Sequence, residues 1–433
     1  MSDIGKLATP PPNGDGAPDG WRFTEIGSVA SVRYGIGQPP EEDPNGVPVL
    51  RATNVKRGRL SREGLLRVRR GAIPESRNPF LKTGDIIVVR SGAYTGDVAM
   101  VTPEWAGSIA GYDLIVSPNE ALDPEFGAFS LLSNSVKDYF RGQRDRSAQP
   151  HLNRQQLEST VIPLPPLPEQ RAIAHVLRTV QRAREATEKV VAASKQLKKF
   201  VLRHLFTYGL ERFDHADRVE TRELETSVFP ASWTTARIQD LANLKYGYCT
   251  SIPRTPPPEG VDIISTAEIT NDGILDLSKL RTIEMPPHLV DRYTVNQGDL
   301  LFNWRNSQEH VGKTALVGTL RTEPTVFASF LIRMRSRKGS DNRFLHFLVR
   351  HLRDQRIFFK QSRRAVNQAN FNANELGALE VAVPTDHEQR EIAAIMSSLD
   401  IKGLCAGIRW TSSRDGFHEL ANFGTLAVCG TTN

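Results

Sequence analysis

Four polar strings in the sequence combine arginine with asparagine, glutamine or tyrosine, side chains that carry fixed sets of hydrogen-bond donors and acceptors. Arginine can pair bidentately with guanine, and asparagine or glutamine can pair with adenine, so the chemistry of these strings suits the reading of base edges. An ordinary solvated loop is the alternative interpretation of each string. The strings are Arg90-Ser-Gly-Ala-Tyr94, Arg144-Asp-Arg146-Ser-Ala-Gln149, Asn303-Trp-Arg305-Asn306-Ser-Gln308 and Arg363-Arg364-Ala-Val-Asn367-Gln368-Ala-Asn370.

Positive charge is concentrated near these strings, although the whole chain of 433 residues carries a net charge of only +6. Residues 51–90 hold eleven Lys or Arg against three acidic residues, and residues 321–364 hold twelve against three. Such runs can neutralise phosphates and supply affinity, while base contacts supply discrimination. The candidate DNA-contacting residues are Arg51, Asn54, Arg90, Tyr94, Arg146, Gln149, Asn303, Arg305, Asn306, Gln308, Lys313, Arg363, Arg364, Asn367, Gln368 and Asn370.

Two glycine motifs approach nucleotide-binding signatures without completing them. A phosphate-binding loop ends in Gly-Lys-[Ser/Thr], as Gly312-Lys313-Thr314 does, but its first glycine should stand where this chain has Ser307. Gly35-Ile-Gly37 lacks the third glycine of a dinucleotide-binding turn, and Pro39-Pro40 would block the helix that must follow. We interpret the first motif as a turn that opens a strand and the second as a loop.

Other catalytic and metal-binding patterns are incomplete as well. Asn78-Pro79-Phe80 has one proline too few for the Asp/Asn-Pro-Pro-aromatic motif of adenine methyltransferases, and His387-Glu388 lacks the second histidine of a zinc protease. Cys249, Cys405 and Cys429 form no CxxC pair, so neither a disulfide framework nor a thiolate metal cluster is indicated. We expect no catalytic residue, no metal and no cofactor on this chain.

The second half of the chain repeats the first half in order. Trp21 and Trp233 each open a segment that ends in Tyr-Gly, at Tyr34 and Tyr246, and both pairs are 212 positions apart. Residues 47–55 then match residues 261–269, Gly84-Asp85-Ile-Ile matches Gly298-Asp299-Leu-Leu, and Gly96 matches Gly312. Asn153-x3-Leu and Glu169-Gln170-Arg171 match Asn372-x3-Leu and Glu388-Gln389-Arg390, at an offset of 219.

The slow drift of this offset is what loops of varying length around one framework would produce. The sequence therefore predicts one domain of about 150 residues that occurs twice, each copy followed by a helix that begins at Glu-Gln-Arg. Apolar runs at 86–89, 98–101 and 330–332 are short and bounded by turn residues, which predicts strands. Helical spacing of apolar residues over 126–140 and 342–359 predicts helices late in each copy.

A long helix is expected between the two copies, because residues 169–208 contain neither Gly nor Pro. About 40 helical residues would extend roughly 60 Å. Small and apolar residues step by four and three along it and form a single coiled-coil seam: Val176, Val180, Ala183, Thr187, Val190, Ser194, Leu197 and Val201. An exposed linker helix is the alternative. The expected fold class is α+β, with two tandem mixed α/β domains joined by a long coiled-coil-type helix.

As a set, these motifs resemble those of the DNA specificity subunit of type I restriction-modification systems. The resemblance rests on the duplicated order of Trp, Tyr-Gly, Gly-Asp, Asn-x3-Leu, a Pro-rich strip and Glu-Gln-Arg-x-Ile-Ala, and it covers residues 20–400. It implies a non-catalytic subunit whose two target-recognition domains each read half of a split site in double-stranded DNA. It also implies that long helices separate these domains and dock two modification subunits, which methylate adenine with S-adenosylmethionine, and that restriction subunits add ATP- and magnesium-dependent cleavage.

The expected organisation follows the repeat. We expect a flexible leader at 1–19, recognition domains at 20–168 and 231–386, a spacer helix at 169–210, a linker at 211–230 and the start of a second spacer helix at 387–400. Hydrophobic residues make up 39% and charged residues 24%, a globular composition without a membrane-spanning run or a signal segment. A cytoplasmic protein without a membrane partner is therefore expected.

The chain departs from the family pattern after position 400. Residues 401–433 contain five glycines and no heptad, and we interpret them as an atypical tail, where the resemblance implies a second long helix. Three hypotheses remain open from the sequence: a specificity subunit, a degenerate copy that acts only as a protein-interaction scaffold, and a nucleotide-dependent enzyme built on Gly312-Lys313-Thr314.

Overall fold

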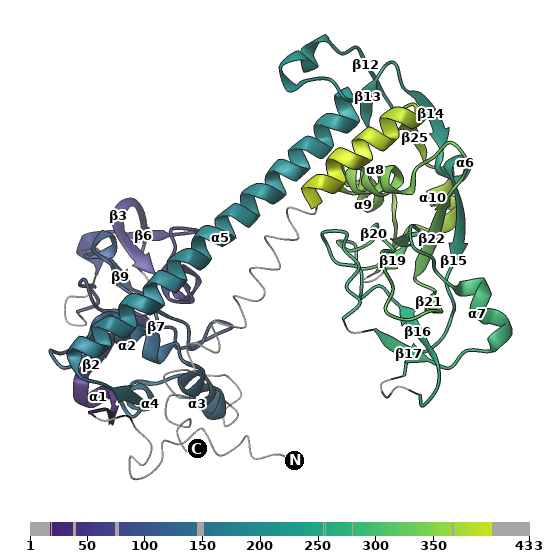
Figure 1. Cartoon of the computed structure of the whole chain (residues 1–433). Coiled ribbons are helices and arrows are strands. Elements are labelled where there is room, and N and C mark those ends of the chain that lie inside the picture. Colours follow the sequence, from purple (N-terminus) through teal and green to yellow (C-terminus); the bar gives the residue numbers. More distant parts are fainter. Residues whose placement is uncertain are drawn as a thin grey trace. The chain divides into compact units, whose positions relative to one another are not determined.

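The computed structural model describes residues 18, 20–37, 40–73, 78–144, 151–253, 255, 257–278, 280–365 and 368–400. The described residues form two units, which divide within one long helix: the first ends at Glu188 and the second begins at Lys189. The interpretation of 401–433 as an atypical tail lies outside the described residues. Each unit contains strands and helices in a mixed arrangement, as the sequence predicted (Figure 1).

Each unit is built on a four-stranded antiparallel sheet with the same strand order. In the first unit this order is β2 (Ala30–Tyr34), β10 (Leu114–Pro118), β7 (Ile86–Val88) and β8 (Val98–Met100). In the second unit it is β15 (Ala242–Tyr246), β22 (Leu331–Ser336), β18 (Leu300–Asn303) and β20 (Thr314–Leu316). Tyr34 pairs with Leu114, and Tyr246 pairs with Ile332, so the registers also correspond.

A second sheet of three strands is also common to both units. Its central strand has one antiparallel and one parallel neighbour. The strands are β6 (Leu66–Val68), β3 (Glu42–Leu50) and β9 (Ile109–Ala110) in the first unit, and β17 (Arg281–Ile283), β16 (Val261–Ile264) and β21 (Thr325–Phe327) in the second. A two-stranded ladder then joins the ends of each copy, as β1 (Arg22–Glu25) with β11 (Val161–Leu164) and β14 (Thr234–Arg237) with β25 (Glu380–Val383).

The stretches 126–140 and 342–359, which the sequence predicted as helical, are each divided into two helices, and both units contain further short helices that the sequence did not predict. In the first unit the helices are α1 (Ile26–Val29), α2 (Pro124–Leu131), α3 (Asn134–Arg144) and α4 (Arg154–Glu158). In the second they are α6 (Ile238–Leu241), α7 (Pro287–Tyr293), α8 (Asn342–Asp354), α9 (Ile357–Gln361) and α10 (Ala373–Ala378). The remaining described strands are β4 (Val55–Lys56) with β5 (Arg59–Leu60), and β12 (Thr221–Glu223) with β13 (Val228–Pro230).

The repeated Trp and Glu-Gln-Arg motifs meet in each unit. The indole Nε1 of Trp21 donates to Glu169 at 3.0 Å, and that of Trp233 donates to Glu388 at 3.1 Å. The neighbouring Gln170 is buried and makes three hydrogen bonds that tie the helix start to the preceding strand and to the N-terminus of α2. These contacts explain why the two distant motifs recur together.

The Gly-Asp motif places a buried carboxylate under the central sheet. Asp85 accepts the Lys82 backbone N–H at 2.9 Å and pairs with Arg33 at 2.9 Å. Asp299 accepts the Asn296 backbone N–H at 2.9 Å and pairs with Arg335 at 2.7 Å. Because a buried charge requires a partner, the carboxylate is paired with an arginine in both copies. The arginine comes from β2 in the first copy and from β22 in the second.

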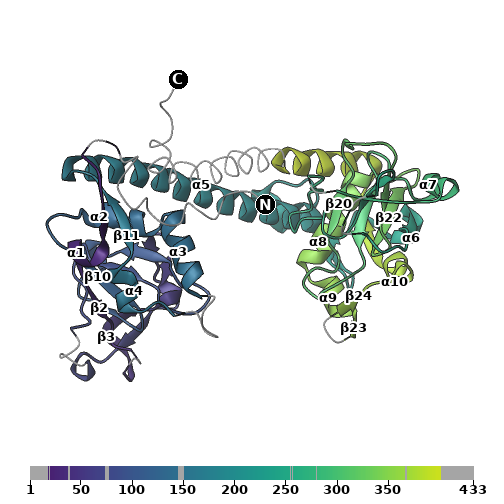
Figure 2. The ribbon, with the colours of Figure 1, turned by 90° about the horizontal axis from the view of Figure 1, so that it is seen from below.

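The long helix expected between the copies is present as α5 (Leu167–Tyr208) (Figure 1). Val176, Val190 and Leu197 of its predicted seam are exposed, whereas the last turns are buried against the helix formed by residues 386–400. That short helix lies along the end of α5 in both views, and its Asp400 pairs with Lys198 (Figures 1 and 2). No helix in the described ranges is both long enough and apolar enough to cross a membrane.

Candidate nucleic-acid interface

Two of the predicted polar strings come together in the second unit. They form a three-stranded sheet of β19 (Arg305–Asn306), β24 (Gln368–Asn370) and β23 (Arg363–Ala365), with β24 in the centre. Arg305 and Arg363 both pair with Asn370 through the main chain. Figure 2 shows β23 and β24 beside α9, on the side of this unit away from α5. Residues separated by some 60 positions are thus neighbours in one small sheet.

The first unit makes an equivalent contact between its first string and residues 151–152, which follow the second string. The Leu152 backbone N–H donates to Arg90 O at 2.8 Å, and Ser91 forms a β-bridge with His151. In the second unit the Phe371 backbone N–H donates to Trp304 O, also at 2.8 Å. Arg90 and Trp304 therefore occupy matching positions, each just after the third strand of the central sheet.

Arg90 lies between two tyrosine rings. Its guanidinium carbon is 4.9 Å from the ring centroid of Tyr34 and 4.4 Å from that of Tyr112. The two rings are 38% and 48% exposed, so this stacked group faces solvent. Tyr94, from the same string, is also exposed. The first unit thus presents a cation held between aromatic faces, an arrangement with favourable cation–π energy.

The matching position of the second unit presents an aromatic cluster. The Trp304 ring lies edge-on to Tyr246 at 5.3 Å and to Phe330 at 6.3 Å, and both of these partners are exposed. The Trp304 Nε1 donates to Ser329 O at 2.7 Å. The Arg305 guanidinium stacks on Phe330 at 5.1 Å. The two units therefore place different chemistry on the same scaffold position.

The repeated Tyr-Gly motif supports this position in both units. The hydroxyl of Tyr34 accepts the Arg154 backbone N–H at the start of α4, at 3.1 Å. The hydroxyl of Tyr246 accepts the Ala373 backbone N–H at the start of α10, at 2.8 Å. The next residue must be glycine, because a Cβ at either Gly35 or Gly247 would collide with a backbone carbonyl.

Three of the predicted contact residues have structural roles instead. Asn54 is fully buried, and its amide donates to Ser61 O and Glu63 O at 3.0 Å each. Lys313 is buried and donates to Ile269 O at 2.6 Å, while burial lowers its pKa. Arg51 donates to Gly64 O at 2.8 Å. In this conformation the side chains of Asn54 and Lys313 are buried and hydrogen-bonded within the fold.

The remaining candidates are only partly described. Asn306 accepts the Ser307 backbone N–H through its own side chain, and Gln308 and Asn370 each bury an amide atom that has no hydrogen-bond partner among the described residues. Arg146, Gln149 and Asn367 lie outside the described residues, as do the side chains of Arg363, Arg364 and Gln368.

The second basic run is less available to phosphates than its composition suggested. Arg335 pairs with Asp299, Arg343 pairs with Asp341, and Arg350 pairs with Asp400. Arg353 donates to the carbonyls of Asn271 and Glu309. Much of this positive charge therefore stabilises the unit itself, a role that a count of charges along the sequence cannot distinguish from DNA binding.

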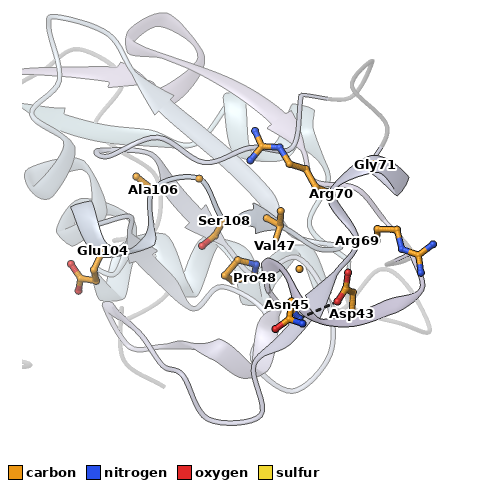
Figure 3. Close-up of a pocket in the computed structure, with 12 residues that line it drawn as sticks. Asp43, Asn45, Val47, Pro48, Arg69, Arg70, Gly71, Glu104, Ala106 and Ser108 are labelled. Atoms are coloured by element: carbon orange, nitrogen blue, oxygen red, sulfur yellow. Dashed lines mark hydrogen bonds between the residues drawn. The ribbon is translucent and has the colours of Figure 1, made fainter.

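A surface pocket of about 570 Å³ lies between the three-stranded sheet of the first unit and the loop at 104–108. Asp43, Arg69 and Arg70 line it, and Figure 3 shows that the two guanidinium groups point apart. Arg70 stacks on Phe80 at 5.5 Å. Since the two arginines do not converge on one point, the pocket lacks the geometry of an anion site.

Asp113 lies beneath the Arg90 site. Its carboxylate accepts the Arg90 backbone N–H at 3.2 Å, and its other oxygen has no partner among the described residues. Burial raises the pKa of this carboxyl from 3.8 to about 6, against the opposing effects of the Arg90 hydrogen bond and charge. The unit therefore contains an acid that titrates near neutral pH.

Asp113→Asn tests that assignment. Because the folded pKa lies above the unfolded pKa, the stabilising contribution of Asp113 is complete below 3.8 and is lost as the pH rises through about 6. A shift of about two units corresponds to roughly 3 kcal/mol. We expect the stability of the variant relative to wild type to rise by about that amount across this interval, measured by chemical unfolding at each pH. A difference that stays constant with pH would contradict the assignment.

Asn303→Val should stabilise the second unit. Asn303 is fully buried, and neither amide atom has a partner among the described residues. The matching residue of the first unit is the buried Val89: Gly96 N–H donates to Val89 O as Gly312 N–H donates to Asn303 O. Removing two unpaired polar atoms should raise the free energy of unfolding by roughly 1–3 kcal/mol. The reciprocal Val89→Asn should lower it, and a loss of stability in Asn303→Val would show that the amide has partners.

Sequence reasoning missed several members of these clusters. Tyr34 and Tyr246 were identified only as repeat markers, and Tyr112, His151 and Phe330 were not singled out. The recurrence of an exposed tyrosine before an obligatory glycine was the available signal for the first two. Nothing in the local sequence marks Tyr112 or Phe330, because their roles depend on strand pairing across the sheet.

Comparison with known proteins supports the resemblance to DNA specificity subunits. Residues 18–193 and 230–404 match the model of the type I restriction modification DNA specificity domain. The EcoBI specificity subunit of Escherichia coli is 25% identical over 398 residues, which cover 88% of this chain and 79% of that protein. The proposed MjaX specificity subunit of Methanocaldococcus jannaschii is 32% identical over 139 residues, only 32% of each chain.

A solved structure shares the fold. The type I restriction-modification S subunit from M. genitalium superposes with a TM-score of 0.59 and 14% identity, over 93% of this chain and 96% of that one. The duplicated framework described above is thus found in a protein of very different sequence.

Proposed function

Since the chain belongs to the family of type I restriction-modification DNA specificity subunits, we propose that each of its two units reads one half of a bipartite site in double-stranded DNA. The proposed recognition domains are residues 20–168 and 231–386. The observation that carries this proposal is the matched pair of solvent-facing clusters, Arg90 with two tyrosines and Trp304 with Tyr246 and Phe330.

The pairing of a constant framework with variable surface chemistry supports this function. Gln170 and Gln389, Asp85 and Asp299 make equivalent contacts, whereas Arg90 is replaced by Trp304 at the exposed position. Two recognition domains that share a scaffold but bind different DNA sequences need this combination. The framework positions each domain on the DNA, and the exposed side chains determine which bases it recognises.

The partners follow from the same proposal. Modification subunits, two of them, dock on the helical part, where Val176, Val190 and Leu197 of α5 expose apolar side chains. They bind S-adenosylmethionine and provide the residues that methylate adenine. Restriction subunits provide ATP- and magnesium-dependent cleavage. The chain itself contributes recognition and no catalytic residue, and its helices set the gap between the half-sites.

Selection of bound sequences from a random duplex library tests the function directly, with the chain purified together with its modification subunits. The proposal predicts enrichment of two short motifs at a fixed spacing, with affinity that falls steeply as salt increases. A pool without sequence preference would favour the interaction scaffold, which the exposed seam of α5 would also serve.

A further inference from the structure

We propose that Arg90, held between Tyr34 and Tyr112, reads a guanine in the half-site of the first unit. This inference rests on the proposed function, since it presupposes that the first unit faces DNA bases. It adds a named reading residue, the base that it reads and the two rings that position it.

The main chain of Arg90 is fixed from two sides. Its N–H donates to the carboxylate of Asp113 at 3.2 Å, and its carbonyl accepts the Leu152 N–H at 2.8 Å. The residue lies two positions after the buried strand β7, which has a neighbouring strand on each side. Arg90 therefore projects from a rigid element, which a reading residue needs if its hydrogen bonds are to discriminate between bases.

The guanidinium plane is fixed as well. Ring centroids at 4.9 Å and 4.4 Å confine it, and Nε is buried without a hydrogen-bond partner among the described residues. Within those residues, the terminal nitrogens form no ion pair or hydrogen bond. Two donors of fixed plane and separation match the O6 and N7 acceptors of guanine, so less side-chain entropy is lost on binding.

The surroundings favour a base over a phosphate. Asp113 lies close enough for the Arg90 charge to act on its carboxyl group, and its negative charge opposes a phosphate more than a neutral base. The exposed rings of Tyr34 and Tyr112 flank the guanidinium on two sides and offer flat surfaces. A simple phosphate contact would need neither the stacking rings nor the buried acid.

The second unit provides an internal comparison. Trp304 occupies the matching position, and its single side-chain donor is already bonded to Ser329 O at 2.7 Å. It offers an apolar face in place of a donor pair. We therefore expect that Trp304 does not read a guanine in the second half-site.

The test uses adenine-methylation maps of host cells in which the wild-type gene is replaced by Arg90→Gln or Arg90→Lys. Both variants should lose the guanine requirement at a single position of one half-site, by roughly 10-fold or more, with the other half-site unchanged. Arg90→Gln should shift that position toward adenine. Arg22→Gln is the matched control, because Arg22 is exposed on β1, belongs to neither polar string of the first unit nor to α5, and should leave both half-sites intact.

Variants of Tyr112 provide a second readout, namely discrimination at the base pair that Arg90 reads. A purely structural role of Tyr112 would not change this discrimination at one base pair alone. Tyr112→Phe keeps the ring and should preserve the motif, whereas Tyr112→Leu should weaken discrimination at the same base pair that Arg90 reads. If Arg90→Lys keeps full specificity while Arg90→Gln binds all sequences more weakly and with a shallower salt dependence, Arg90 contacts a phosphate and the inference is overturned.

Two other outcomes separate the inference from the function on which it rests. An unchanged motif in both Arg90 variants would leave the proposed function standing and overturn the reading role. The absence of any split motif in the wild-type map would overturn the proposed function and, with it, this inference.

Discussion

Gln170→Leu is expected to lower the free energy of unfolding of the first unit by roughly 3–5 kcal/mol. The side chain is 1% exposed, donates to Pro165 O at 2.8 Å and Ala121 O at 3.0 Å, and accepts the Asp123 N–H at 2.8 Å. Leucine has nearly the same volume but leaves three backbone groups unpaired, one buried and two half-buried. Each such group costs about 1–3 kcal/mol.

The measurement is urea unfolding of the complete chain, followed by a signal from each unit. Gln155→Leu is the matched control, because Gln155 is exposed on α4 and its replacement should change stability by less than about 0.5 kcal/mol. Gln389→Leu should have a smaller effect in the second unit, where the three equivalent bonds are longer, at 3.1–3.3 Å. Equal effects of Gln170→Leu and Gln155→Leu would contradict the proposed role of this residue in joining the repeat motifs.

Replacing Arg305 and Asn306 together with alanine is expected to lower discrimination in the second half-site by roughly 10-fold or more. Both residues lie on β19, where they pair with the central strand of the small polar sheet. A bidentate hydrogen-bonded pair with a base contributes about 1–3 kcal/mol of discrimination, so selectivity should fall roughly 10- to 100-fold for each pair that alanine cannot form. Binding of the purified complex to the intact site and to sites with single base changes measures this selectivity.

The first half-site supplies the internal control for this double variant, since its selectivity should not change. Arg212→Ala is a matched charge removal in the same unit, because Arg212 is exposed and pairs with Asp214 away from the polar sheet. Selectivity that falls equally in both half-sites, or equally in Arg212→Ala, would exclude β19 as a reading element.

The framework was largely predictable because its signals are local and repeated. The Glu-Gln-Arg motif, the Asn caps of α4 and α10 and the Gly-Asp turns each satisfy backbone groups within a few residues, so similar contacts require similar residues in both copies. The uninterrupted stretch after Pro168 likewise predicted α5. Periodicity and capping chemistry are short-range, and the repeat offers each signal twice.

The reading surface was only partly predictable. The polar strings were found by composition, but burial decides the roles of their residues. The side chains of Asn54 and Lys313 donate hydrogen bonds to backbone carbonyls. Arg90 instead lies between two tyrosine rings, 56 positions before it and 22 positions after it in the sequence. Arginines that stabilise the second unit, such as Arg335 and Arg350, have the same local signature as arginines that could bind DNA. These distinctions depend on strand pairing, which local composition does not encode.

The most direct test of the central claim is a single-base map of adenine methylation in the host genome, with and without this gene. The account predicts that loss of the gene removes methylation from one bipartite motif, two short half-sites around a fixed gap, and leaves other methylated motifs unchanged. An identical map in both strains, with the chain expressed and bound to its modification subunits, would contradict the claim that its two units specify a DNA site.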